Sequence, residues 1–476
     1  MSARDFSASN WRGEFQPQAG AISAAAEIAG KVEAKARDIP AQSMRNSEDR
    51  VFLFLQGPPG PLFQRLGGAM AEHGITVHRI NISGGDARDW NEGATNFRGR
   101  FADWPAFFDR YLRQHGVTDL MLFGDCRPYH ISAHGIAQLR NIRIHVLEEG
   151  YLRPNWMTLE PEGVNAHSTL SRDKHWFLAE AEHLKPDPYL PPITASFRRR
   201  ARDSYWHYHS VVTGLLAFPH YRSHRRSSLI LEGLGWLWKL ARQKRRDQRA
   251  QFVLQQLAGK DYFVFPLQLS TDSQIRVHSL FPDMQSAAAF TLESFASHAP
   301  ANVHLLIKSH PLSPSFFNWS RFIGRVARRL RIEDRVHFVD GGDLDAMLEA
   351  ARGLVCVNST SATLALARSI PVCTIGEAIY DMDGLTHQGH LDSFWPDPTP
   401  PEPGVYPAFR RVLVDRCLVR GGLASESAVE ILIQSILDRL KIGREAQSAP
   451  EESGREMERL YARLGISRTT AAVRSK

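Results

Sequence analysis

Short apolar runs alternate with longer amphipathic stretches from residue 51 onward. The runs are four to six residues long, and most are rich in Val, Ile, Leu or Phe. Runs of this kind are typical of buried strands, and strands that alternate with helices form parallel βαβ units. The expected strands are 51–55, 76–80, 119–123, 142–147, 262–266, 303–307, 336–339, 354–357 and 372–375.

The amphipathic stretches predict the helices, and the whole pattern divides the chain into segments. The expected helices are 62–73, 104–115, 131–140, 284–297, 316–330, 343–351, 361–368 and 426–441. We therefore expect an α/β protein with two Rossmann-like halves and a ligand-binding cleft between them. The segments are an N-terminal extension (1–50), a first Rossmann-like domain (51–190), a basic segment (191–255), a second Rossmann-like domain (256–395), a helical region (396–445) and a polar tail (446–476).

Positive charge gathers in the basic segment. The 476-residue chain has 58 Lys and Arg against 51 Asp and Glu, but residues 198–249 hold thirteen basic residues against three acids. Trp206, Trp236 and Trp238 lie among them. Basic residues with Trp and Leu on a helix suit an anionic membrane surface. The alternatives are a solvated helical hairpin packed on the body, or nucleic-acid binding, which no recognised motif supports.

Composition and motifs exclude several classes. Four cysteines without a CxxC pair argue against a disulfide scaffold and a structural zinc site, and fit a reducing compartment. No apolar stretch is long enough to cross a membrane, and residues 1–15 lack the apolar core of a signal peptide. There is no P-loop, GxSxG or HExxH motif, and no GxGxxG follows a strand.

Candidate catalytic residues follow the strands of the first half. Glu148 and Glu149 come directly after the run that ends at residue 147, and a carboxylate at such a strand end can act as general base or nucleophile. The alternative is a helix cap or a surface turn. Arg127, His130 and Arg153 lie near the same edge and are candidate substrate-binding residues, and either arginine could bind a substrate anion or form a surface salt bridge.

The second half offers candidate phosphate ligands at its strand ends. Lys308, His310 and Pro311 follow the run at 303–307. Asn358, Ser359 and Thr360 open a helix, where hydroxyl and N–H groups bind phosphate or simply cap the helix. Gln268 lies in a polar loop after 262–266 that could hold the donor or the acceptor, and it is a candidate substrate-binding residue. We read Asp343 as a helix N-cap and not as a metal ligand.

Taken together, these motifs resemble those of the capsule polysaccharide biosynthesis family, of the KpsS/LipB type of β-Kdo transferase. More broadly they resemble bacterial CMP-sugar transferases of the GT-B fold. The resemblance runs from about residue 51 to about residue 389. The residues that carry it are Phe123-Gly-Asp-Cys-Arg-Pro-Tyr-His130, Leu147-Glu-Glu-Gly-Tyr-Leu-Arg-Pro154, Thr158-Leu-Glu160, Leu267-Gln268, Lys308-Ser-His-Pro311, Val357-Asn-Ser-Thr360, Gly376-Glu-Ala-Ile-Tyr-Asp381 and Gly384-Leu-Thr386.

The resemblance implies a GT-B-like enzyme whose two Rossmann-like domains face a central cleft. The first domain would be catalytic and bind the acceptor, and the second would bind the nucleotide sugar. The implied reaction transfers Kdo from CMP-Kdo to a (lyso)phosphatidylglycerol lipid, with retention of the β configuration, and starts a capsular polysaccharide linker. Glu149 would be the catalytic carboxylate, His310 the CMP-phosphate ligand, and Ser359 and Thr360 the nucleotide ligands.

The chemistry of the substrates agrees with this implication. Kdo is anionic, so its site needs a cation such as Arg127 or Arg153, while Lys308 and His310 can offset charge on the departing phosphate. CMP is a good leaving group, so we expect no obligatory metal or cofactor. A lipid acceptor favours a peripheral location on the cytoplasmic face of the inner membrane, with other capsule proteins as possible partners and no nucleic acid.

Two rival functions stay open at this point. One is a UDP-sugar-dependent GT-B enzyme, either an epimerase or a transferase. The other is a non-catalytic capsule assembly or export protein that binds lipid. This chain also differs from related Kdo transferases at the catalytic position. They have Asp where this chain has Glu149, and Glu is longer by one methylene.

Overall fold

The computed structural model describes residues 50–186, 190–191, 193, 196–223, 242–269, 275, 279–310 and 317–443. The chain divides into two units, Met1–Asp49 and Arg50–Lys476, and everything below concerns the second. The expected polar tail, nearly all of the N-terminal extension, Pro311, Trp236 and Trp238 lie outside the described residues.

The first half is a seven-stranded sheet of order β12-β6-β5-β4-β1-β2-β3. Strands β3, β2, β1, β4 and β5 are parallel, whereas β6 and β12 are antiparallel to their neighbours. The order reverses between β1 and β4, which makes this the topological switch point of the sheet. The strands are β1 (Val51–Phe54), β2 (Thr76–Asn81), β3 (Thr95–Asn96), β4 (Asp119–Phe123), β5 (Arg143–Glu149), β6 (Trp156–Pro161) and β12 (Leu418–Arg420).

The second half is a five-stranded parallel sheet of order β11-β10-β7-β8-β9. Its switch point lies between β7 and β10. Strand β7 is buried along its whole length, as expected of a central strand covered on both faces. The strands are β7 (Tyr262–Pro266), β8 (His304–Lys308), β9 (Val336–Val339), β10 (Gly353–Cys356) and β11 (Val372–Thr374). Two successive Rossmann-like sheets confirm the expected GT-B-like α/β class.

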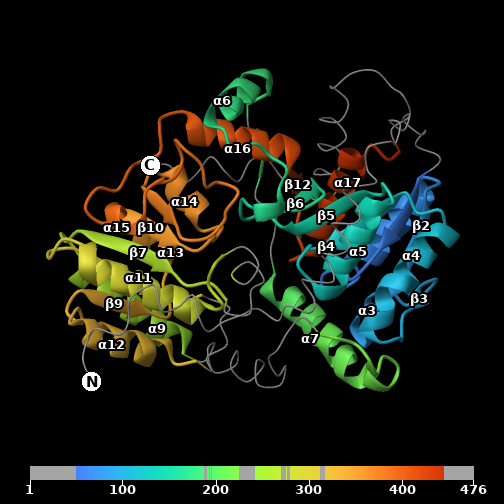
Figure 1. The fold of residues 1–476 in the computed structure, drawn as a ribbon, viewed down its shortest axis with the longest axis horizontal. Coiled ribbons are helices and arrows are strands. Elements are labelled where there is room, and N and C mark those ends of the chain that lie inside the picture. The colour runs from blue at the N-terminus through green and yellow to red at the C-terminus, as the bar shows by residue number, and fades with distance from the viewer. Residues whose placement is uncertain are drawn as a thin grey trace. The chain divides into compact units, whose positions relative to one another are not determined.

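Helices follow the strands in both halves (Figure 1). In the first half they are α2 (Leu62–Glu72), α3 (Gly84–Asp89), α4 (Trp104–Gln114) and α5 (Pro128–Leu139); in the second they are α11 (Met284–His298), α12 (Trp319–Leu330), α13 (Leu344–Leu348), α14 (Ala362–Ala367) and α15 (Leu391–Phe394). The Asp343 side chain accepts a hydrogen bond from Asp345 N at the start of α13, which confirms the predicted N-cap.

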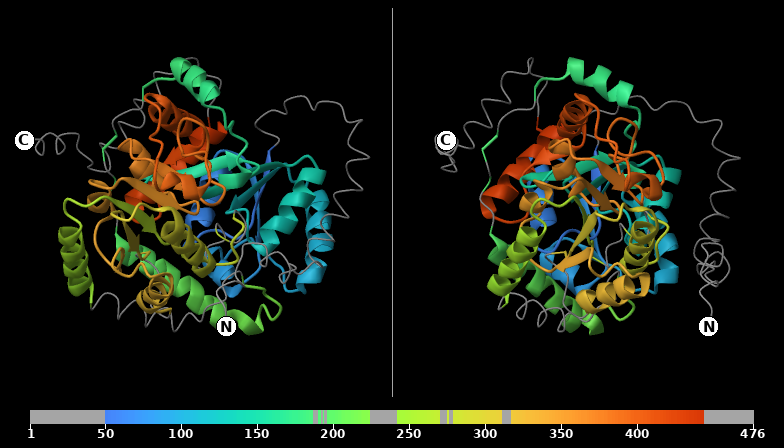
Figure 2. Two further views of the ribbon diagram at one scale, coloured as in Figure 1. Left: turned by 60° about the vertical axis from the view of Figure 1, so that its left-hand side comes forward. Right: turned by 90° about the vertical axis from the view of Figure 1, so that its left-hand side faces the viewer.

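The last described elements of the chain return to the first sheet (Figures 1 and 2). After α16 (Val405–Arg416), strand β12 pairs with β6, and α17 (Glu426–Leu440) packs on α2. Helix α6 (Lys174–His183) lies on α16. The region 396–445, expected to be helical, therefore also supplies a strand. The sequence pattern missed β12 because three residues are too few to show a period.

The described parts of the basic segment pack on different halves. Helix α7 (Phe197–Thr213) continues into the 3-10 turn η5 (Gly214–Leu216) and lies along α3 of the first half, whereas α9 (Gln243–Gln256) packs on β9 of the second half. Glycines make the α3–α7 contact close: a Cβ on Gly84 would lie 2.2 Å from Ser210 O, and one on Gly214 would lie 2.7 Å from Gly84 Cα.

Candidate active site

Hydrogen bonds bridge the switch point of each sheet. In the first sheet, Arg127 Nη1 donates to Gln56 O (3.3 Å) and Gly57 O (3.1 Å), so it joins the loop after β4 to the loop after β1. In the second sheet, Gln268 Nε2 donates to Asn358 Oδ1 (2.8 Å), and Asn358 N donates to Gln268 Oε1 (3.1 Å). Loops at switch points are where open α/β sheets bind ligands, and here both are fixed in place.

The acidic pair forms the last two residues of β5, whereas the sequence pattern placed the pair directly after the strand. Because β6 pairs with β5 up to Glu149, the strand extends two residues further. Successive strand residues point to opposite faces. Glu148 Oε2 accepts a hydrogen bond from Asn165 Nδ2 (3.0 Å). A Cβ on Gly150 would lie 2.2 Å from Trp156 O, so only glycine fits directly after the pair.

Two arginines converge on Glu149. Arg200 Nη2, from helix α7, donates a hydrogen bond to Glu149 Oε1, and Arg153 Nη2 lies 3.8 Å from Glu149 Oε2. Burial raises the pKa of Glu149, but the two guanidinium groups outweigh it and hold the pKa below its ordinary value. The Glu149 carboxylate is therefore ionised at neutral pH.

His130 lies in the core beneath this edge of the sheet. Its side chain is fully buried, and Nδ1 donates to Gly124 O at 2.6 Å, which leaves Nε2 as the unprotonated nitrogen. Burial, and next Arg127, lower the pKa of His130 to about 3, so the ring is neutral. A direct role of His130 in substrate binding stays a prediction. The geometry favours an indirect role, in which His130 holds the loop from Gly124 to Arg127 in place.

Lys308 is the last residue of β8 and His310 lies two residues beyond it, and their binding of phosphate stays a prediction. Lys308 is buried at the last strand position, Ser309 N donates to Val339 O (2.9 Å), and His310 is half-buried. Burial lowers the pKa of Lys308, and Asp340 and Arg246 act on it in opposite directions. Arg246 comes from α9 and pairs with Asp340 (2.9 Å), so the basic helix reaches this strand end.

The segment with Ser359 and Thr360 lies next to the acidic pair Glu148 and Glu149 of the first half. Ser361 is the N-cap residue of α14, so neither Ser359 nor Thr360 occupies that position; Ser359 Oγ accepts from Ser361 N (3.2 Å). Thr363 Oγ1 donates to Tyr151 O (3.4 Å). Tyr151 also shares a hydrophobic core with Ala362 and Tyr380. The segment after Glu149 therefore packs directly on the helix after Thr360.

The structure adds residues that the sequence pattern did not identify. Arg200 appeared only as one of many basic residues, and nothing in the sequence indicates that it meets Glu149, 51 positions away. Asn165 reaches the acidic motif from a segment with no chemical motif of its own, and Thr363 reaches it from the helix that follows Asn358, Ser359 and Thr360. Contacts of this kind depend on the fold and leave no local signal.

One group of described side chains has ligand atoms of the kinds that bind metals. Atoms of Asp125, Cys126 and His167 lie within 4.8 Å of one another. They already form a hydrogen-bonded cluster, because Asp125 accepts from His167 Nδ1 (2.9 Å) and Cys126 Sγ (3.1 Å). Burial raises the pKa of Asp125, but these hydrogen bonds lower it to about 2. The expectation that no metal is required stays a prediction.

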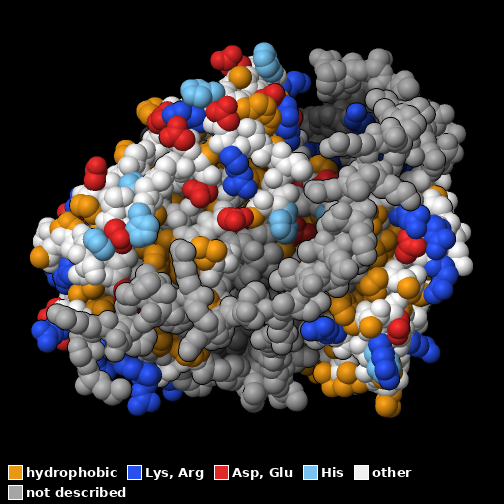
Figure 3. Space-filling model, viewed as in Figure 1, with side chains coloured by type: hydrophobic (Ala, Val, Ile, Leu, Met, Phe, Trp, Pro, Cys, Tyr) orange, Lys and Arg blue, Asp and Glu red, His pale blue; other side chains and the backbone are white. Residues whose placement is uncertain are grey.

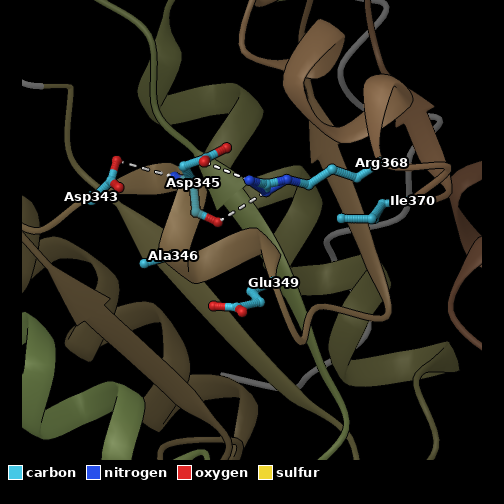
Figure 4. A pocket seen from close by; sticks show the side chains of 6 residues that line it. All are labelled: Asp343, Asp345, Ala346, Glu349, Arg368 and Ile370. Atoms are coloured by element: carbon cyan, nitrogen blue, oxygen red, sulfur yellow. Dashed lines mark hydrogen bonds and ion pairs between the residues drawn. The ribbon is translucent and has the colours of Figure 1, made fainter. Parts of the chain in front are cut away.

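A surface pocket is lined by α13 and by residues at the end of α14 and beyond it (Figure 4). Three of its side chains are acidic (Asp343, Asp345 and Glu349), against Arg368, which pairs with Asp345 at 2.5 Å. An acidic lining repels phosphate and sugar carboxylates. The pocket contains none of the predicted site residues, so we do not place the active site there.

Fold and site together define an α/β protein of two Rossmann-like sheets, with an ionised carboxylate at a strand end of the first and cationic and hydroxyl groups at strand ends of the second. Residues 118–423 match the family described as capsule polysaccharide biosynthesis protein. The chain therefore belongs to the capsule polysaccharide biosynthesis protein family.

Named relatives agree with this membership. The capsule polysaccharide modification protein LipB of Neisseria meningitidis serogroup A is 33% identical over 81% of this chain and 94% of LipB. The capsule polysaccharide export protein KpsS of Escherichia coli is 30% identical over 76% of this chain and 94% of KpsS. A solved structure of KpsC from Thermosulfurimonas dismutans, described as a β-Kdo 2,7 transferase, covers 81% of this chain and 99% of its own, with 16% identity and a TM-score of 0.39.

Proposed function

We propose that this protein is a glycosyltransferase that moves Kdo from CMP-Kdo to a (lyso)phosphatidylglycerol lipid and so starts the linker of a capsular polysaccharide. The observation that carries the proposal is the environment of Glu149. In a member of a capsule biosynthesis family, this carboxylate stands at a strand end and is kept ionised by Arg200 and Arg153. An anionic nucleophile beside fixed cations suits transfer of an anionic sugar.

Glu149 acts as nucleophile in this proposal. A general base works best with a pKa near neutrality, whereas the pKa of Glu149 is lowered, so this carboxylate is a poor base but fully anionic. It attacks the anomeric carbon, and the bond to the CMP phosphate breaks with its electron pair leaving on the phosphate. The acceptor hydroxyl then attacks the same carbon, loses its proton to water and releases Glu149. Two displacements retain the β configuration.

The second sheet binds the nucleotide. Lys308 and His310 lie at the end of β8, where a cation offsets the charge that develops on the departing phosphate. Asn358 is fixed by Gln268 across the switch point, and it begins the segment that carries the Ser359 and Thr360 hydroxyl groups. We assign CMP to these residues, with Gln268 acting through Asn358.

The protein works at the surface of an anionic membrane in this proposal. No helix in the described part of the chain combines the length and apolar character needed to cross a bilayer. Helix α7 turns His207 towards α3, but Tyr205 and Val212 lie on its opposite side and are more than half exposed. Leu215 is 53% exposed and Leu216 is 96% exposed. We call Tyr205, Trp206, Val212, Leu215 and Leu216 the α7–η5 surface.

Basic side chains accompany this apolar surface. Arg88 lies over the Trp206 ring at 5.8 Å, and Arg222 is exposed a few residues beyond η5. Figure 3 shows hydrophobic, basic and histidine side chains together in the region where Figure 1 places α7. Apolar side chains that enter the headgroup layer, with arginines that reach phosphates, favour an anionic bilayer as the partner.

The test is a reaction of purified protein with CMP-Kdo, generated in situ, and a fluorescent lysophosphatidylglycerol. We expect a Kdo-lipid product from the wild type, and a loss of at least about 10²-fold in Glu149→Gln. Glu162→Gln is the matched control, since Glu162 is a partly exposed carboxylate just beyond β6 that accepts a hydrogen bond from Gln138. A protein mass increased by one Kdo residue would identify the covalent intermediate.

Parallel reactions separate the rival functions. Product formation that survives EDTA supports the expectation of no obligatory metal. Turnover of UDP-sugars but not of CMP-Kdo would replace the proposed donor. Folded protein that binds the lipid but turns over no nucleotide sugar would favour the assembly or export function.

A further inference from the structure

The charge around Glu149 is unbalanced on its own face of the sheet. Two guanidinium groups, of Arg153 and Arg200, meet one carboxylate. The neighbouring Glu148 points to the other face and bonds Asn165. The arginine side chains are 56% and 47% exposed, so a small anion can reach them from solvent.

Both arginines keep unused hydrogen-bond donors. A guanidinium group has five N–H donors in a planar fork that matches a carboxylate. Arg200 uses Nη2 on Glu149, while Arg153 approaches the same carboxylate only to 3.8 Å. No other side chain among the described residues accepts a hydrogen bond from either arginine. A second carboxylate can therefore bind beside Glu149.

We propose that Arg200 and Arg153 bind the carboxylate of the anionic sugar donor and thereby hold its anomeric carbon against Glu149. This inference rests on the proposed function. In a 2-ulosonic acid the carboxylate is bonded directly to the anomeric carbon. A residue that contacts both Glu149 and that carboxylate therefore places the reacting carbon next to the nucleophile.

The charges of the complex then balance. Glu149 and the sugar carboxylate would repel each other at close range, and two guanidinium groups offset both. Arg127, the other expected carboxylate ligand, instead joins the loops of the switch point through Gln56 O and Gly57 O. The structure thus favours Arg200 over Arg127 as the partner of Arg153.

Helix α7 fixes the position of Arg200. Arg200, His207 and Gly214 are spaced seven residues apart, so they share one side of α7. On that side His207 Nδ1 bonds Asp89 Oδ2 (2.6 Å), and both side chains are buried. Gly214 meets Gly84 at close range. The helix is therefore held on the first half at two points beyond Arg200, and the arginine is presented by a rigid element.

The experiment measures the donor KM in Arg200→Gln and Arg153→Gln. For each we expect the KM for CMP-Kdo to rise about 10- to 100-fold, the loss typical of a hydrogen bond to a charged group, with the inhibition constant of CMP unchanged. Arg200→Lys should recover part of the loss. Arg202→Gln is the control, because Arg202 is on the same helix and 63% exposed, and its Nε lies 3.5 Å from Asp203 Oδ1. A fall in kcat with the donor KM unchanged would overturn the inference.

A binding measurement keeps this test independent of turnover. Titration of tryptophan fluorescence with free Kdo and with its methyl ester compares the same sugar with and without the carboxylate charge. The wild type should prefer the acid, and Arg200→Gln should lose that preference. Equal binding of acid and ester by the wild type refutes the carboxylate site, even if the protein makes product. Absent turnover with an intact preference refutes only the proposed reaction.

Discussion

Gln268 and Asn358 exchange two hydrogen bonds across the switch point of the second sheet, at 2.8 and 3.1 Å. Both side chains are buried, so neither amide can turn to water for a partner. The pair fixes the position of the loop after β10 relative to the loop after β7. The start of the Ser359–Thr360 segment is therefore set by a side chain 90 residues away.

Gln268→Ala tests this link. The substitution leaves Asn358 N and its side chain without their buried partner, which should lower the free energy of unfolding by about 1–3 kcal/mol. Affinity for CMP should fall as well, because Ser359 and Thr360 lose their fixed position. Chemical denaturation and CMP titration measure the two effects. In the double variant Gln268→Ala/Asn358→Ala, the stability losses should be clearly less than additive, and additive losses would argue against a coupled pair.

The pH dependence of activity reports on Arg200. Burial alone would raise the pKa of Glu149, and Arg200 contributes to lowering it. In Arg200→Gln the pKa of Glu149 therefore rises, and the carboxylate becomes protonated at higher pH than in the wild type. The acid limb of kcat/KM should move to higher pH, while Arg200→Lys should keep it near the wild-type position. An unmoved limb in Arg200→Gln would mean that another group controls it.

Gly84→Ala tests the docking of α7. Its Cβ would lie 2.2 Å from Ser210 O and 2.9 Å from Gly214 Cα, both backbone atoms that cannot turn away. We expect a loss of about 1–3 kcal/mol of stability and a fall in activity, because α7 carries Arg200. Gly68→Ala is the matched control. Gly68 lies in α2 with nothing within 4 Å of its Cβ, so alanine there should be neutral or stabilising by roughly 0.5–1 kcal/mol. Thermal denaturation and the transferase assay compare the two.

Leu216→Asp tests the membrane surface. Leu216 is 96% exposed, so a charged residue there should leave the fold intact but remove apolar contact with a bilayer. We expect weaker flotation with phosphatidylglycerol vesicles and little change in thermal stability. Leu280→Asp controls for a charge at another leucine, 99% exposed, outside the α7–η5 surface. Equal flotation of both variants and the wild type would rule this surface out as the contact.

Most of the parallel strands were predictable because they are short runs rich in apolar residues, several of them buried along all or nearly all of their length. All nine expected strands appear within two residues of their bounds, and β4, β7 and β9 have the expected bounds. The short strands β3 and β12 and the antiparallel β6 were not predicted. Strand β6 contains Thr158 and Glu160, both buried, so its sequence lacks the apolar signature of its neighbours.

The candidate site was predictable only in part, for a physical reason. Strand ends are visible in the sequence, so Glu149, Lys308 and Asn358 could be found where a run stops. Their partners come from other segments: Arg200 reaches Glu149 from α7, and Gln268 reaches Asn358 from the loop after β7. Such pairs form only when distant segments pack together, so the spacing of residues along the chain does not predict them.

The pairing of β12 with β6 has a consequence for biosynthesis. The N-terminal sheet needs residues 418–420 to cover the edge of β6, and α17 packs its buried side against that half. A ribosome makes the first half long before these residues emerge. Until then β6 presents unpaired backbone groups, which favour association with other chains. The nascent protein therefore has a long interval in which chaperones can act, and a nonsense mutation before residue 418 would leave an incomplete first domain.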